Sequence, residues 1–86
     1  MARIAAIGMV DHDEVLHLDR IPRPGGSAII TRVSESPGGT TANTVVALAR
    51  LGEQVTFRAV IGNDPEGARL RDGLEREGID CTMVTT

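Results

Sequence analysis

Residues 36–43 read Ser-Pro-Gly-Gly-Thr-Thr-Ala-Asn and lead directly into residues 44–52, Thr-Val-Val-Ala-Leu-Ala-Arg-Leu-Gly. In the second stretch the apolar residues recur at helical spacing, which predicts a helix that packs on a sheet. The first turn of such a helix has free backbone N–H groups and the positive end of the helix dipole. Because Gly38 and Gly39 place no side chains in front of that turn, a polar ligand can approach the bare backbone.

Strand and helix patterns alternate along the rest of the chain. The expected elements are a strand at 3–8, a flap of two or more strands at about 15–33, a helix from 40 or 41 to 51, a strand at 54–62, a helix at 65–77 and a strand at 81–84. The first strand is short and apolar, as expected of a strand buried on both faces of a parallel sheet. This order predicts an α/β layered fold with parallel crossovers. Two helices can hardly cover both faces of three core strands, so we expect the 86 residues to be the first part of a larger domain or to depend on a partner.

The composition is that of a globular protein with one domain, at 41% hydrophobic and 24% charged residues. Phe57 is the single aromatic residue, which predicts an aliphatic core. A net charge of -3 without a basic stripe argues against nucleic acid as a partner. Neither a signal peptide nor a membrane span is expected from the apolar runs. Cys81 is the only cysteine, which fits a cytoplasmic protein, and we expect it to be a buried hydrophobe.

Asp11 and Asp13 follow the first predicted strand, and open α/β sheets bind their ligands at the carboxyl ends of strands. A carboxylate only accepts hydrogen bonds, so it can hold two neighbouring hydroxyl groups of one molecule. These two residues are therefore candidates for binding sugar hydroxyls or a metal. The alternative interpretation makes Asp11 a turn residue and Asp13 a solvated charge.

Asn43 lies in the first turn of the predicted helix and offers both donors and an acceptor to a hydroxyl-rich ligand. In the alternative interpretation the glycines form the turn, Thr40 or Thr41 caps the helix, and Asn43 is solvated. His12 and His17 lack the spacing of a metal site and are predicted to be surface or flap residues.

Asp64 and Glu66 are explained by helix capping and by the helix dipole. The sequence contains neither a P-loop nor a dinucleotide-binding glycine motif. A nicotinamide-dependent oxidoreductase therefore has little support.

The chain resembles the amino-terminal portion of the ribokinase-like (PfkB) carbohydrate and nucleoside kinases over nearly all of its length. The segments that carry this resemblance are IAAIGMVDHD, LDRIPRPGG, SPGGTTANTVVALARLG and VTFRAVIGNDPEGARLRDGLEREGID. The Gly-Gly-x-x-Ala-Asn element, followed by Ala-Leu-Ala-Arg-Leu-Gly and then by Gly-Asn-Asp-Pro-x-Gly, resembles the first signature of that family.

The resemblance implies a three-layer α/β/α domain with a small β-sheet lid at about 15–33 that often serves as a dimer interface. It implies a soluble sugar kinase that uses ATP and Mg²⁺. The residues it assigns to the sugar are Asp11, Asp13, Gly38, Gly39, Thr40 and Asn43, with Asp13 holding two hydroxyl groups. Thr40 stands where ribokinases commonly carry lysine, and Gly26 stands where many members have glutamate.

The resemblance also implies that the catalytic base is an aspartate in a Gly-Ala-Gly-Asp motif beyond residue 86. The implied acceptors include ribose, fructose, a keto-deoxy acid, a sulfonated sugar and a nucleoside. A second hypothesis is a module of the same fold that binds a ligand or dimerises without catalysis.

Overall fold

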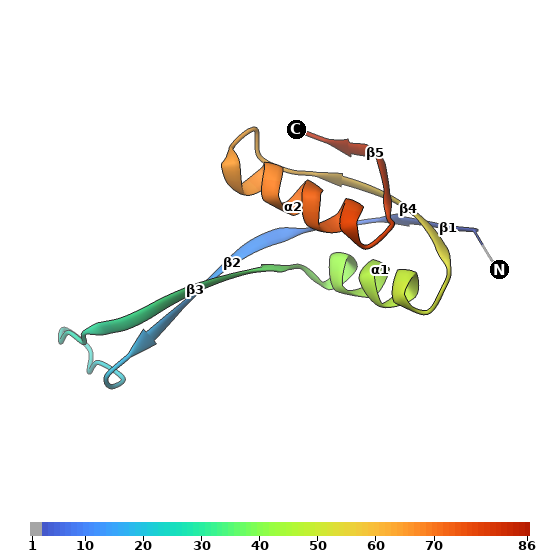
Figure 1. Ribbon diagram of the computed structural model, residues 1–86. Helices are drawn as coiled ribbons and strands as arrows, with labels where there is room; N and C mark the ends of the chain where they lie inside the picture. The colour runs from blue at the N-terminus through green and yellow to red at the C-terminus, as the bar shows by residue number, and fades with distance from the viewer. Residues whose placement is uncertain (1–2) are drawn as a thin grey trace.

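The computed structural model describes residues 3–86 and contains five strands and two helices. In chain order these are β1 (Arg3–Ile7), β2 (Asp11–Leu18), β3 (Ile30–Gly38), α1 (Thr40–Arg50), β4 (Gln54–Val60), α2 (Pro65–Arg76) and β5 (Asp80–Thr85). Figure 1 shows a layered body, formed by three strands and both helices, from which β2 and β3 project. The projecting hairpin makes the molecule long, at 52 × 27 × 20 Å.

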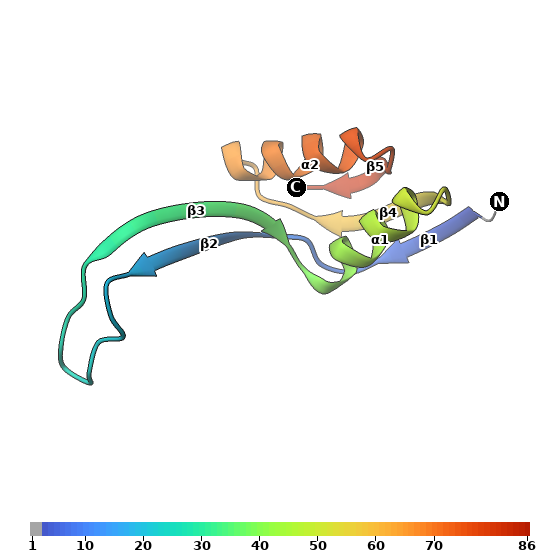
Figure 2. The same cartoon turned by 60° about the horizontal axis from the view of Figure 1, so that its bottom comes forward.

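The body is a parallel sheet in the order β1-β4-β5, covered on one face by α1 and α2. Both helices lie on the same face (Figure 2) because consecutive right-handed crossovers run across the sheet in one direction. The α/β fold predicted from the sequence is confirmed for these layers. No helix within residues 3–86 has the length and apolarity needed to cross a bilayer.

The core lies between the sheet and the two helices and is aliphatic apart from Phe57, as the composition predicts. Phe57 and Val45 are fully buried at its centre. The buried set is completed by Ala42, Val55, Ala59, Ile61, Leu70, Leu74, Ile79, Cys81 and Val84. In β4 the buried residues alternate with exposed ones, so that only one face of this central strand is covered.

The opposite face of the sheet is open, which differs from the expected burial of the first strand on both faces. Ile7 of β1 is 77% exposed and Val60 of β4 is 71% exposed. The physical reason is that the two helices of this chain cover the same face. An apolar strand pattern indicates which residues avoid water, but it does not say which segment of chain covers them.

The antiparallel hairpin of β2 and β3 is longer than the flap expected at about 15–33. Its pairing runs from Asp11 opposite Gly38 to Leu18 opposite Ile30. The start of β2 was not recognisable as a strand because residues 11–14 are all polar and show no apolar alternation. Asp11 and Asp13 therefore lie within a strand and not in a turn.

The two helices begin in different ways. α2 begins as predicted, with Asp64 as N-cap and its side chain accepting from the backbone N–H of Gly67 at 2.7 Å. α1 begins after Gly39, and no side chain caps it, so capping by Thr40 or Thr41 is wrong. At the far end of α1, Leu51 is 79% exposed and does not extend the buried face of the helix.

Candidate functional site

The hairpin joins the body where the end of β1 meets the start of α1. A Cβ atom on Gly8 would lie 2.0 Å from the hydroxyl oxygen of Thr41, so only glycine lets the helix approach this closely. The backbone N–H of Ala42 donates to the carbonyl oxygen of Met9 at 3.2 Å. Gly39 has a φ of 102°, a conformation that favours glycine, and a Cβ atom there would lie 2.8 Å from the Met9 oxygen. These close contacts join both ends of the hairpin to the amino-terminal end of α1.

The two aspartates lie on one face of the hairpin, next to Gly38. Residues two apart in a strand share a face, and Asp11 lies opposite Gly38 in the register while Asp13 lies opposite Ser36. A Cβ atom on Gly38 would be 2.3 Å from Oδ2 of Asp13 and 2.5 Å from Oδ1 of Asp11. The absence of a side chain at position 38 therefore allows the two carboxyl groups to converge above the buried backbone of β3.

The carboxyl group of Asp11 is the least satisfied polar group here. Its Oδ1 atom is buried and has no hydrogen-bond partner within residues 3–86. The hydrogen bond with the Asp13 carboxyl, followed by burial and the negative charge of Asp13, raises the pKa of Asp11 above 3.8, while the nearby His12 lowers it. A buried acceptor without a donor is costly, and a ligand hydroxyl placed between the two aspartates would satisfy it.

The start of α1, which no side chain caps, lies in the same region. Thr40 begins the helix behind Gly39, and the first turn carries no acidic side chain. Asn43 is exposed, and only its backbone N–H is bonded, to the carbonyl oxygen of Gly39 at 2.9 Å. Its amide side chain forms no hydrogen bond within residues 3–86, either to the aspartates or to any other residue. Asn43 is therefore accessible to a ligand, and its assignment to the sugar stays a prediction.

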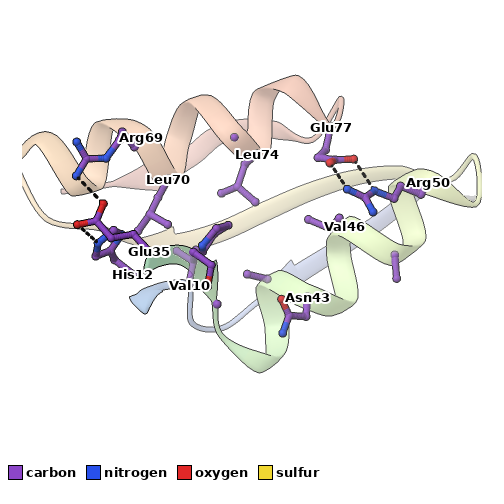
Figure 3. Close-up of a pocket in the computed structure, with 16 residues that line it drawn as sticks. Val10, His12, Glu35, Asn43, Val46, Arg50, Arg69, Leu70, Leu74 and Glu77 are labelled. Carbon is purple, nitrogen blue, oxygen red and sulfur yellow. Dashed lines mark hydrogen bonds and ion pairs between the residues drawn. The ribbon is translucent and has the colours of Figure 1, made fainter. Parts of the chain in front are cut away.

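A groove of about 620 Å³ runs between α1 and α2 (Figure 3). Its walls include Val46 of α1 and Leu70 of α2, and Gly38 and Asn43 line its hairpin end. Asp11 and Asp13 do not line this groove, because the side chains that the hairpin turns toward α2 belong to the opposite face. The predicted sugar residues therefore form two groups, the carboxylate pair with Gly38 and the start of α1 with Asn43.

Ion pairs stand at both ends of the groove (Figure 3). At the far end Arg50 of α1 donates two hydrogen bonds to Glu77 of α2, at 2.9 and 2.6 Å. At the hairpin end Glu35 lies between His12, at 3.7 Å, and Arg69 of α2, at 3.9 Å. His12 was predicted to be a surface or flap residue. Its pairing with Glu35, and that of Glu35 with Arg69, were not foreseen because these residues come from distant parts of the sequence.

The remaining candidates have structural roles in this part of the protein. Asp64 and Glu66 lie at the N-cap and in the first turn of α2, as expected from their positions before and after Pro65. Cys81 is buried, and this burial raises the pKa of its thiol above 9.0. Its neighbours in the core are aliphatic, so it behaves as the small buried hydrophobe that the sequence predicts.

A three-stranded parallel sheet with two helices on one face and a projecting hairpin after the first strand is the architecture of the amino-terminal part of ribokinase-like proteins. The pfkB family of carbohydrate kinases matches residues 1–86, the whole chain. The chain therefore belongs to the pfkB carbohydrate kinase family.

Solved structures share this fold. A ribokinase from Thermotoga maritima superposes with a TM-score of 0.86 at 30% identity, over 96% of this chain and 28% of its own. A ribokinase from Cryptococcus neoformans, crystallised in complex with ADP, has a TM-score of 0.83 at 34% identity, over 99% of this chain and 26% of its own.

A curated relative is similar at the level of sequence. A nucleoside kinase from Methanothermobacter thermautotrophicus is 36% identical over 81 residues, which cover 94% of this chain and 26% of the relative. The chain thus spans about a quarter of the length of the relatives that it matches.

Proposed function

We propose that this chain is the acceptor-binding portion of an ATP-dependent kinase that phosphorylates a hydroxyl group of a sugar or nucleoside. Membership of the pfkB family and the similarity to ribokinases and a nucleoside kinase support the activity. The observation that carries the assignment of the site is the convergence of Asp11 and Asp13 over Gly38.

The aspartate pair is suited to a vicinal diol. Each hydroxyl group of a sugar donates one hydrogen bond, and the pair presents four carboxyl oxygens on one face of the hairpin. Oδ1 of Asp11 needs a donor that residues 3–86 do not supply. Hydrogen bonds to a charged acceptor contribute about 1.5–3 kcal/mol each, so Asp13 can dominate the affinity for the acceptor.

The start of α1 completes the proposed site. No side chain caps the helix at Gly39 and Thr40, and Asn43 adds an amide with donors and an acceptor. Because the carboxylate pair and Asn43 form separate groups in this structure, the proposal requires the hairpin to move toward α1 when the acceptor binds. Such a closure would exclude water from the acceptor hydroxyl, which protects ATP from hydrolysis.

The residues that the structure describes form no cluster suited to Mg²⁺. Within residues 3–86 no group of three His, Cys, Asp or Glu side chains could hold a metal ion, and we derive no step that involves the nucleotide from this chain. The role that we assign to these residues is to bind and orient the acceptor. Positioning of this kind accounts for most of the catalysis of phosphoryl transfer.

The hairpin also supports a homodimer formed through the lid. Leu16, Leu18, Ile30 and Val33 share the face of the hairpin opposite the aspartates, and they are between 42% and 51% exposed. Four aliphatic side chains on one exposed strand face favour association with a second copy. Sedimentation of the Leu16→Asp variant of the full-length protein would show a monomer if this face forms the dimer.

The test of the proposed site uses the full-length protein and a panel of acceptors that includes ribose, fructose, a keto-deoxy acid and adenosine. Asp13→Asn is expected to weaken binding of the accepted sugar by about 10- to 150-fold, the equivalent of one charged hydrogen bond. Gly38→Ala is expected to act similarly, because its methyl group displaces both carboxyl groups.

Glu14→Gln is the matched control, since Glu14 is the next residue in β2 and its side chain lies on the opposite face. Calorimetric titration measures the affinities, and ADP release measures turnover. Unchanged acceptor affinity in Asp13→Asn would exclude the assigned site. Acceptor binding without any phosphorylation in the wild-type protein would favour the non-catalytic module.

A further inference from the structure

Four basic and acidic side chains, placed alternately, connect the hairpin to the body. They run from His12 in β2 through Glu35 in β3 to Arg69 and Glu66 in α2. Nitrogen and oxygen lie 3.7 Å apart in the first pair, 3.9 Å in the second and 3.3 Å in the third. Figure 3 shows His12, Glu35 and Arg69 side by side at the hairpin end of the groove.

The register of the two strands explains why this row of side chains affects the position of the two aspartates. His12 lies between Asp11 and Asp13 in β2, and its side chain points to the opposite face of the hairpin. Glu35 lies next to Ser36, the residue paired with Asp13. An ion pair that holds His12 and Glu35 toward α2 therefore fixes the same short segment of backbone that carries both carboxyl groups.

Within residues 3–86, the pair of Glu35 with Arg69 is the one ion pair between the hairpin and the body. The backbone connections are two short segments, residues 8–10 and residue 39. The second of these contains the positive φ of Gly39. Because these two connections are short, a contact outside them can change the orientation of the hairpin.

We infer that Glu35 and Arg69 are positioning residues, which brace the base of the hairpin against α2 and so set the orientation of Asp11 and Asp13. Glu66 competes for Arg69 from the same helix and weakens the brace. The consequence for acceptor binding rests on the function proposed above, but the brace itself does not.

The side chains are exposed, so the brace is weak and reversible. Glu35 is 52% exposed and Arg69 is 57% exposed. Solvent-exposed ion pairs of this kind change an equilibrium by about 1.4- to 5-fold and weaken as salt rises. A contact of this strength biases the orientation of the hairpin without fixing it.

The test compares Arg69→Gln and Glu35→Gln with the control Arg76→Gln in the full-length protein. Arg76 is also on α2 and also pairs with an acid, Asp72 at 2.5 Å, but it does not contact the hairpin. The first readout is hydrogen–deuterium exchange at residues 8–10 and 39–42, where Ala42 donates to Met9. Exchange there is expected to increase by about 1.4- to 5-fold in both test variants and not in the control.

Two further variants test whether the charge of Arg69 and its pairing with Glu66 control the exchange rate. Arg69→Lys keeps the charge and is expected to restore slow exchange, whereas Glu66→Gln is expected to slow exchange below the wild-type rate. Raising the salt concentration screens the ion pair, so hydrogen–deuterium exchange in the wild-type protein is expected to become as fast as in Arg69→Gln. Equal exchange in Arg69→Gln, Arg76→Gln and the wild-type protein would overturn the inference.

The second readout is the KM for the best acceptor of the panel described above. Arg69→Gln is expected to raise this KM by about 1.4- to 5-fold, the factor expected for hydrogen–deuterium exchange. The KM for ATP is expected to stay unchanged. Faster exchange with an unchanged acceptor KM would support the brace and would contradict the proposed role of the aspartates. Failure of the brace and failure of the acceptor site are thereby distinguishable.

Discussion

Two glycines of α2, six residues apart, are predicted to respond to alanine with opposite signs. A Cβ atom on Gly67 would lie 1.9 Å from the carbonyl oxygen of Gly62, whereas one on Gly73 would meet no atom within 4 Å. Ordinary Cβ atoms do not approach closer than 3.0 Å, so the Gly62 carbonyl must move by about 1.1 Å. This carbonyl is backbone, and it precedes the residue that caps the helix, Asp64.

The magnitude follows from three contributions. Overpacking of a well-packed contact costs about 1–3 kcal/mol, and loss of the Asp64 cap costs about 1 kcal/mol. Replacing glycine by alanine inside a helix stabilises the helix by about 1 kcal/mol. We therefore expect Gly67→Ala to destabilise the protein by about 1–3 kcal/mol and Gly73→Ala to stabilise it by about 0.5–1 kcal/mol.

Urea unfolding of the full-length protein, followed by far-ultraviolet circular dichroism, measures both changes. Asp64→Ala alone should cost about 1 kcal/mol, and its effect should be smaller in the Gly67→Ala background because both changes weaken the same cap. A Gly67→Ala variant within about 0.5 kcal/mol of the wild type would refute the packing that we describe around Gly62. The same conclusion would follow if Gly67→Ala and Gly73→Ala both stabilised, or both destabilised, the protein.

Two further predictions concern titratable groups in the body. The pKa of Glu77 is lowered below 4.5 by its hydrogen bonds from Arg50, so its contribution is present above that pH and is lost as the pH falls through the lowered value. Glu77→Gln should therefore reduce stability at neutral pH and converge with the wild type in urea titrations once the pH falls below the lowered pKa. Because burial raises the pKa of Cys81, native protein should alkylate at this residue far more slowly than unfolded protein; equal labelling of both, measured by peptide mass spectrometry, would contradict its place in the core.

Local signals in the sequence were sufficient where one short segment decides the structure. Asp64 followed by Pro65 predicted the start of α2, and Gly52, with a φ of 93°, lies just after the end of α1. The aliphatic core around Phe57 also followed from composition and spacing. Each of these features depends on backbone conformation or on a helical repeat, and a single sequence shows both.

The hairpin shows where such signals were insufficient. Residues 11–14 have no alternation of apolar and polar residues, so β2 could not be recognised there, although its pairing with β3 is regular. The role of Gly38 was assigned from its place before a helix. In the structure its importance lies in the space it leaves for two carboxyl groups of another strand.

The sequence by itself determined the class of fold, the family, and which polar residues lie near the ends of the strands and at the start of α1. Only the tertiary structure decided that Asp11 and Asp13 meet above Gly38 while Asn43 lies apart from them. It also decided that Glu35 reaches Arg69 across 34 positions in the chain. The physical reason is that strand register and helix placement set these distances, and both depend on contacts between segments that are remote in sequence.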